Sequence, residues 1–190
     1  LERRSALGQA ALELFFRELF EWGEIQTDPN FGNYRIRIAG EQGGDSETDR
    51  IVLLDFGAVQ SYSSDFLKPV IQMIRASYEE DLEQVVEGGI KLRFMSRDWP
   101  AEVLDKFGKV CMSVLEPLAK DRSQWPDYAV NSHGQYRWKQ SDLPSRVAKQ
   151  AARSAISRYF RVPPKEFVFL NRKLIGVYTF IAVLQAEFNG

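Results

Sequence analysis

The sequence has very little of the two residue types on which most protein metal centres and many nucleophilic sites depend. Cys111 is the only cysteine and His133 the only histidine among 190 residues. A single cysteine excludes an internal disulfide and a thiolate-based zinc site. A single histidine excludes multi-histidine metal centres and argues against a Ser-His-Asp hydrolase.

The chain also lacks an excess of charge of either sign, since its formal net charge at pH 7 is -1. A protein that neutralises phosphates needs a basic face, so we expect no nucleic-acid partner. Hydrophobic residues make up 44% of the chain and charged residues 27%, a composition that allows a packed core. The length suits one domain, or one large lobe of a bigger protein.

No apolar run is long enough to suggest a membrane span. The stretch "LIGVYTFIAVL" (174–184) falls short of the ~20 apolar residues that a bilayer requires, so we expect a core helix there. The chain opens without methionine or a secretory leader, inside a helical pattern. We therefore expect a segment whose upstream portion is missing.

Apolar residues at helical spacing predict a mainly α fold. Residues 5–22 are apolar on most sides, which predicts a buried helix. An irregular connection is expected over 120–142. The further helices are predicted over 64–78, 80–90, 100–119, 143–160 and 164–188.

Only two strands are expected, and they should form one β-hairpin. "YRIRI" (34–38) alternates as a strand does, and "IVLLDFG" (51–57) is an apolar strand. The polar, glycine-rich stretch 39–49 between them has the composition of a hairpin loop.

The stretch "IQTDPNFGNYRI" (25–36) does not have the composition of ordinary packing. Its Asp, Pro, Asn and Gly residues could simply form a turn. However, Asp28 and Asn33 have the D-x-x-x-x-N spacing of a kinase catalytic loop. The second strand then ends in Asp55-Phe56-Gly57, the D-F-G that supplies a metal-binding carboxylate in kinases.

The two motifs support each other chemically. Mg²⁺ takes carboxylate and amide oxygens and leaves other positions for phosphates and water. Because hairpin strands pair antiparallel, Asn33 and Asp55 should lie side by side, with Asp28 near the transferred phosphate. Either motif alone is weak, whereas their order along the chain favours a kinase-like phosphate site.

With these motifs in place, the sequence resembles the UbiB-type atypical kinases, also called AarF-domain proteins. The similarity lies in "ELFFRELFEWGEIQTDPNFGNYRI" and "IVLLDFGAVQSY", and in the closing "VPPKEFVFLNRKLIGVYTFIAVLQAEFN". The form "QTDPN" is most similar to the coenzyme Q biosynthesis branch. Many members have histidine where this chain has Gln26, and that histidine is mainly structural in kinases.

The resemblance implies the C-terminal lobe of a protein-kinase-like fold over residues 1–190, using ATP and Mg²⁺. Asp28 would be the catalytic-loop acid, while Asn33 and Asp55 would bind the metal and, through it, the nucleotide. The function implied is support of ubiquinone biosynthesis or lipid homeostasis. The partners implied are quinone precursors or lipids and quinone-biosynthesis proteins. The implied location is the cytoplasm or the mitochondrial matrix side, peripheral to a membrane.

Two departures from protein kinases narrow the expected activity. No A-P-E follows the D-F-G before the helical pattern starts, so the platform for a peptide substrate is missing. This favours ATP hydrolysis or a small-molecule acceptor. Only about two dozen residues precede the loop, so the phosphate-covering loop and the strand lysine are expected to be absent. We therefore expect this chain alone to be inactive.

Two other functions remain open from the residues. One is a non-catalytic regulatory or scaffold module that keeps the kinase fold. The other is a small-molecule phosphotransferase of the aminoglycoside or choline kinase type, which shares a D-x-x-x-x-N loop. Retention of Asp28, Asn33 and Asp55 argues against the first, and the D-F-G form argues against the second.

The remaining polar features have simpler interpretations. Ser61, Ser63 and Ser64 are expected to cap a helix, and Cys111 to be a small buried hydrophobe. His133 is expected in a solvent-facing loop. The basic stretch 146–161 could touch anionic lipid heads, but the sequence favours a solvated helix face.

Overall fold

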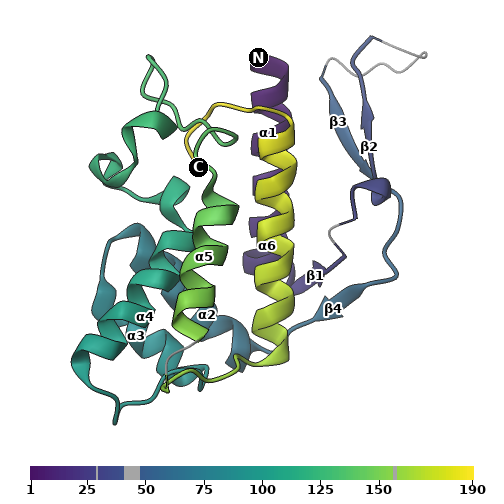
Figure 1. Cartoon of the computed structure of the whole chain (residues 1–190). Helices are drawn as coiled ribbons and strands as arrows, with labels where there is room; N and C mark the ends of the chain where they lie inside the picture. The colour runs from purple at the N-terminus through teal and green to yellow at the C-terminus, as the bar shows by residue number, and fades with distance from the viewer. Residues whose placement is uncertain (29, 41–47, 156–157) are drawn as a thin grey trace.

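The computed structural model describes residues 1–28, 30–40, 48–155 and 158–190, and is mainly helical (Figure 1). The fold is therefore mainly α, as the sequence predicted. The helices are α1 (Glu2–Arg17), α2 (Ser64–Tyr78), α3 (Leu82–Lys91), α4 (Ala101–Val114), α5 (Leu143–Ala155) and α6 (Lys165–Val183). The strands are β1 (Glu24–Gln26), β2 (Tyr34–Arg37), β3 (Arg50–Leu53) and β4 (Val59–Ser61).

The first and last helices, α1 and α6, lie side by side and run in opposite directions (Figure 1). They approach closely at Gly8, where an added Cβ would lie 2.8 Å from the ring of Phe188 and 3.2 Å from Ile181. A larger residue at this position would force the two segments apart. Segment 23–62, which carries the loop, lies beside this closely packed helix pair (Figure 1).

Segment 23–62 forms two separate antiparallel pairs of strands. Strands β2 and β3 pair as expected, with Tyr34 opposite Leu53 and Arg37 opposite Arg50. Most of their connecting loop, 41–47, lies outside the described residues. The side chain of Asp49 accepts a hydrogen bond of 2.9 Å from Arg3 of α1 and another from the backbone of Ala39. These bonds join the far end of the hairpin to the first helix.

The expectation of only two strands was wrong, because β1 and β4 also pair, with Gln26 opposite Val59. Each of these strands has three residues, too short for an alternating pattern to be recognised. The second predicted strand was also too long. It ends at Leu53, and Asp55-Phe56-Gly57 forms the turn between β3 and β4.

The helices were predicted in the right places, with errors at their ends. The predicted 100–119 helix ends at Val114 and a 3-10 turn, Glu116–Leu118, follows it, because Pro117 has no backbone N–H with which to continue the α-helical bonding. The predicted 143–160 helix ends at Ala155, and residues 156–157 of that prediction lie outside the described residues. The predicted 164–188 helix ends at Val183. The stretch 120–142 is irregular, as expected.

The first helix is less buried than its sequence predicted. After Arg17 the backbone continues as a short π-helix, Glu18–Trp22, which ends at Gly23 in the left-handed conformation. The wider turn changes the direction in which successive side chains point. Leu19 is buried as predicted, but Trp22 is 54% exposed.

Candidate functional site

The loop from Gln26 to Asn33 is held at its start by the β1–β4 pair. Thr27, which directly follows β1, donates two hydrogen bonds to the carbonyl of Ala58, from its backbone N–H at 3.0 Å and from its hydroxyl at 2.9 Å. Ala58 directly follows Gly57. The D-x-x-x-x-N loop is therefore bonded to the segment that carries the D-F-G.

Gln26 joins the two motifs through its side chain. Its amide nitrogen Nε2 donates to the backbone carbonyl of Asp55 at 2.6 Å, and its oxygen Oε1 accepts from the backbone N–H of Asp28 at 3.2 Å. The residue is 4% exposed, so water does not compete for these bonds. Sequence reasoning treated Gln26 only as a replacement for a structural histidine and missed this bridge.

Within the loop, Asp28 and Asn33 are bonded directly to each other. Asn33 Nδ2 donates to Asp28 Oδ2 at 2.8 Å, and the other carboxylate oxygen accepts from the backbone of Asn30 at 3.2 Å. The Asn30 side chain in turn caps the short 3-10 turn Phe31–Asn33 by accepting from Gly32. Both oxygens of Asp28 are thus oriented by the loop itself.

Asp55 directly follows Leu54, whose backbone bonds to Asn33 at the end of the loop. The N–H of Leu54 donates to the backbone carbonyl of Asn33 at 2.9 Å, which extends the β2–β3 pairing by one step. Asp55 is exposed, and its Oδ1 accepts from the backbone of Gly57 at 2.7 Å. The structure therefore bonds Asn33 to Asp28 through their side chains, and to the residue before the D-F-G through its backbone.

The donor atoms available at this place fit Mg²⁺. Asn33 uses its amide nitrogen on Asp28, which leaves its amide oxygen as a ligand, and Asp55 keeps Oδ2 for the same purpose. Oxygen donors of this kind are those that Mg²⁺ takes. No cluster of three or more His, Cys, Asp or Glu side chains that could hold a metal occurs among the described residues. The fit therefore rests on this carboxylate–amide pair.

A buried ion pair lies beneath the loop. Lys173 of α6 is 3.2 Å from Glu18 Oε2 and donates to the hydroxyl of Tyr34 at 3.4 Å, and Lys173 is 2% exposed. Burial raises the pKa of the Glu18 carboxyl, a rise that the Lys173 ammonium opposes. The backbone N–H of Gln26 lies 3.5 Å from Glu18 Oε1. The pair links α6, the π-helix and both ends of the loop.

Comparison with known proteins gives the same assignment as the motifs. Residues 2–88 match the ABC1 atypical kinase-like domain. The chain is 29% identical over 175 residues, 92% of its length, to the atypical kinase coq-8, mitochondrial, of Caenorhabditis elegans. It is 28% identical over 93% of its length to the atypical kinase COQ8B, mitochondrial, of Rattus norvegicus. These matches support assignment of the chain to the UbiB-type atypical kinases, in their coenzyme Q branch.

A third relative is similar over nearly the whole chain. It is the Dictyostelium discoideum protein named "Probable serine/threonine-protein kinase abkA", 29% identical over 99% of the chain. The chain spans 31% of that protein, 21% of the nematode protein and 29% of the rat protein. It thus corresponds to about a third or less of these curated relatives.

Around the D-F-G, the surface is apolar and open. Phe56 is 60% exposed, and Leu54 and Val59, close to it in the sequence, are exposed as well. Helix α2 begins soon afterwards at Ser64, and Ser63 caps it by accepting from the backbone of Phe66, as predicted. No long segment separates the D-F-G from this helix.

Proposed function

We propose that residues 26–57 form the C-terminal-lobe half of a Mg·ATP site. In this proposal Asp28 is the catalytic-loop acid, and Asn33 and Asp55 are the metal ligands through which the nucleotide is held. The observation that carries the proposal is the hydrogen bond between Asn33 and Asp28, next to the backbone bond from Leu54 to Asn33. A simple turn does not require Asp28 and Asn33 to bond to each other beside the segment that leads into Asp55.

Each residue has a distinct task in phosphate transfer. Mg²⁺ held by Asn33 and Asp55 would supply positive charge against the phosphate oxygens. The carboxylate of Asp28, held in place by Asn33 and Asn30, would accept a hydrogen bond from the attacking hydroxyl or water and then its proton. Gln26 fixes the distance between the two motifs by bonding to both.

For the full-length protein we propose an ATPase or small-molecule kinase that supports ubiquinone biosynthesis or lipid homeostasis. The names of the relatives support a mitochondrial setting. Quinone precursors, lipids and quinone-biosynthesis proteins are the proposed partners. No helix among the described residues is long and apolar enough to cross a bilayer. The chain by itself, without a lysine-bearing strand and a covering loop, is proposed to be inactive.

The roles are tested by Asp28→Asn in the full-length protein, with ATP turnover and Mg·ATP affinity measured side by side. We expect turnover to fall by about 10²–10⁴-fold while affinity stays within a few-fold, because a positioned base acts mainly in the transition state. Nucleotide binding without turnover in the wild type would favour a regulatory or scaffold module instead. Unchanged turnover in the variant would mean that Asp28 is structural.

A further inference from the structure

The helical half of the molecule contains a large apolar cavity that the nucleotide site does not use. Its volume is about 230 Å³, and it lies between α2, α4, α5 and α6. Protein interiors are close-packed, and voids larger than a water molecule are few. Its apolar wall includes Val70 and Met73 of α2, Cys111 and Val114 of α4, and Leu170 and Leu174 of α6.

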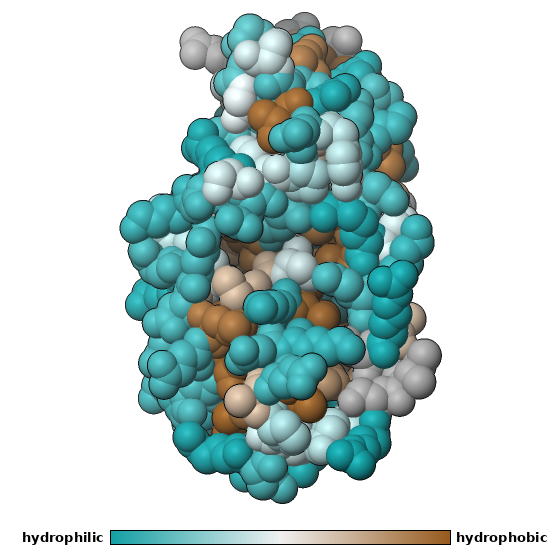
Figure 2. All heavy atoms as spheres, turned by 60° about the vertical axis from the view of Figure 1, so that its left-hand side comes forward, coloured by the Kyte–Doolittle hydropathy of each residue, from teal (hydrophilic) through white to brown (hydrophobic). Residues whose placement is uncertain are grey.

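The lining is nearly all hydrophobic, so the cavity is suited to an apolar guest. Apolar cavities stay dry, since a water molecule inside would lack hydrogen-bond partners. The face that carries α3 and α4 is hollowed, with hydrophobic atoms on the floor and hydrophilic atoms on the rim (Figure 2). Two residues of the α5–α6 connection are also exposed, Phe160 at 41% and Val162 at 78%.

Arg161 is the one charged residue of this lining. Its guanidinium lies 5.4 Å from the centre of the Trp99 ring, a stacking arrangement that leaves the N–H groups at its edge available. It forms no ion pair with any carboxylate among the described residues. Asp98 lies nearby, but its strongest contact is the Ser96 hydroxyl, and Arg161 contributes least to lowering its pKa.

Asn171 adds a second polar side chain to the lining and is itself exposed. Helix α6 begins at Lys165, between the lining residues Pro163 and Phe167, and no side chain caps its first N–H groups. A guanidinium and free backbone N–H groups both favour a negatively charged head, although Glu166 in the same turn reduces the effect. The cavity thus joins an apolar interior to a cationic edge.

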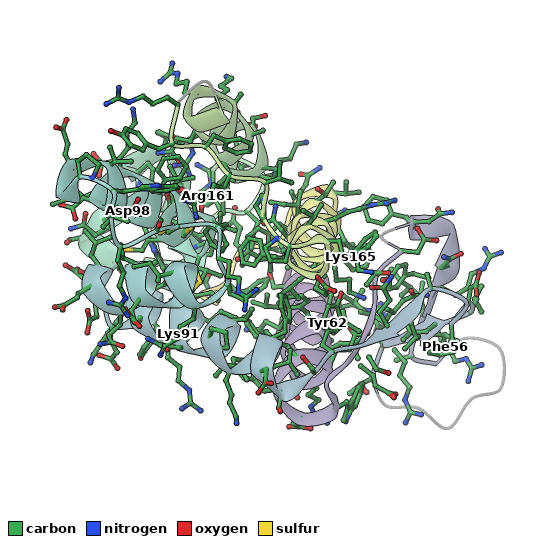
Figure 3. All side chains as sticks on the ribbon, turned by 90° about the horizontal axis from the view of Figure 1, so that it is seen from below. Phe56, Tyr62, Lys91, Asp98, Arg161 and Lys165 are labelled. Atoms are coloured by element: carbon green, nitrogen blue, oxygen red, sulfur yellow. The ribbon has the colours of Figure 1, made fainter. Side chains whose placement is uncertain are left out.

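We propose that this cavity binds a single-chain amphiphile with a carboxylate head, its tail between α2, α4 and α6 and its head on Arg161. The site is separate from the Mg·ATP half-site. Seen from below, Arg161 and Asp98 lie at one end of the molecule and Phe56 of the D-F-G lies at the other (Figure 3). The proposal therefore does not depend on the nucleotide chemistry.

The test is calorimetric titration of the full-length protein with laurate and with dodecanol, below their aggregation concentrations. Laurate should bind about tenfold more tightly than dodecanol, because only laurate can form a charge-assisted bond to Arg161. Arg161→Gln should remove this difference without weakening dodecanol. Arg158→Gln, whose guanidinium stacks on Tyr159 instead, is the matched control and should change neither.

Variants with larger side chains in the cavity test whether the tail of the amphiphile binds there. Cys111→Phe and Val114→Phe should abolish binding of both probes, while Val183→Phe, which adds the same kind of side chain at a site 67% exposed, should not. Thermal melting supplies a second readout, because a bound ligand should raise the melting temperature of the wild type and of Val183→Phe but not that of the two filling variants. Laurate binding that survives both filling variants would overturn the proposal. So would binding to phosphatidylglycerol vesicles without any laurate binding, which would mean a surface contact instead.

Discussion

At the scale of single residues, Gln26 supports the proposed site more than any other side chain that takes no part in the chemistry. It contacts the backbone on both sides of the site, at Asp28 and at Asp55. Both partners are main-chain atoms, so the role does not depend on the identity of the neighbouring side chains. It does depend on an amide, which has one donor and one acceptor end.

Gln26→Glu should therefore lower ATP turnover in the full-length protein by about tenfold or more. The substitution keeps the shape but places a carboxylate oxygen against the Asp55 carbonyl, where Nε2 now donates at 2.6 Å. Turnover by phosphate release is the measurement, and circular dichroism checks the fold. Gln9→Glu, at an exposed position of α1, is the matched control and should turn over ATP as the wild type does. Equal ATP turnover in Gln26→Glu and the wild type would mean that Gln26 does not position the two motifs.

Cys111 allows a residue-scale test of burial through pH. Burial raises the pKa of its thiol from 9.0 to about 12. Between these values the unfolded chain loses the thiol proton and the folded chain keeps it, so the free energy of unfolding falls as pH rises. The stability gap between wild type and Cys111→Ala should narrow by about 2 kcal/mol by about pH 10.5. Urea unfolding with reductant present would measure it, and a gap independent of pH would contradict the assignment.

Contacts between residues close together in the sequence could be predicted. Contacts between residues far apart in the sequence could not. Asp28 and Asn33 are close in the chain and follow a known spacing, so their contact could be expected. The bond from Gln26 to Asp55 spans 29 positions, and no periodic pattern encodes such a bond. Lys173 belongs to an apolar helix and would ordinarily be placed on its exposed side.

At the scale of elements, the Glu18–Lys173 pair connects the π-helix to α6. Glu18→Gln should destabilise the fold by about 3 kcal/mol, because it leaves the Lys173 ammonium buried without a counter-charge. The double variant Glu18→Gln with Lys173→Met should recover most of that loss. Urea unfolding measures both free energies.

The matched control for this pair is Glu13→Gln on the same stretch of helix. Glu13 pairs with Arg17 at 2.8 Å, but their side chains are 63% and 53% exposed. Loss of an exposed pair costs about 0.5 kcal/mol or less. If Glu18→Gln lowered the free energy of unfolding no more than Glu13→Gln does, the buried pair would not stabilise the structure beneath the loop.

Elements were predictable where a pattern runs over several turns. Helix α2 was predicted over its full length because apolar spacing, a capping Ser63 and the following acidic turn all agree. Strands β1 and β4 were missed because their pairing depends on the D-F-G turn folding back, not on their own three residues. The end of α1 was misjudged because a π-turn has no sequence period of its own.

At the scale of the whole molecule, the chain divides its chemistry between two ends (Figure 3). The hairpin end carries the polar loop and an exposed apolar surface at Phe56 and Leu54. The helical end carries the cavity and Arg161. Helices α1 and α6 lie between the two, and α6 contributes side chains to both, Lys173 beneath the loop and Leu174 in the cavity wall.

The central claim is that Asn33 and Asp55 hold the metal of a Mg·ATP site, and calorimetric titration of full-length Asp55→Asn with Mg·ATP tests it most directly. The substitution keeps the shape of the side chain and removes its negative charge, so Mg·ATP affinity should fall by about a hundredfold or more. Asp65→Asn, at an exposed position in the first turn of α2, should bind as the wild type does. Unchanged Mg·ATP affinity in Asp55→Asn would contradict the account.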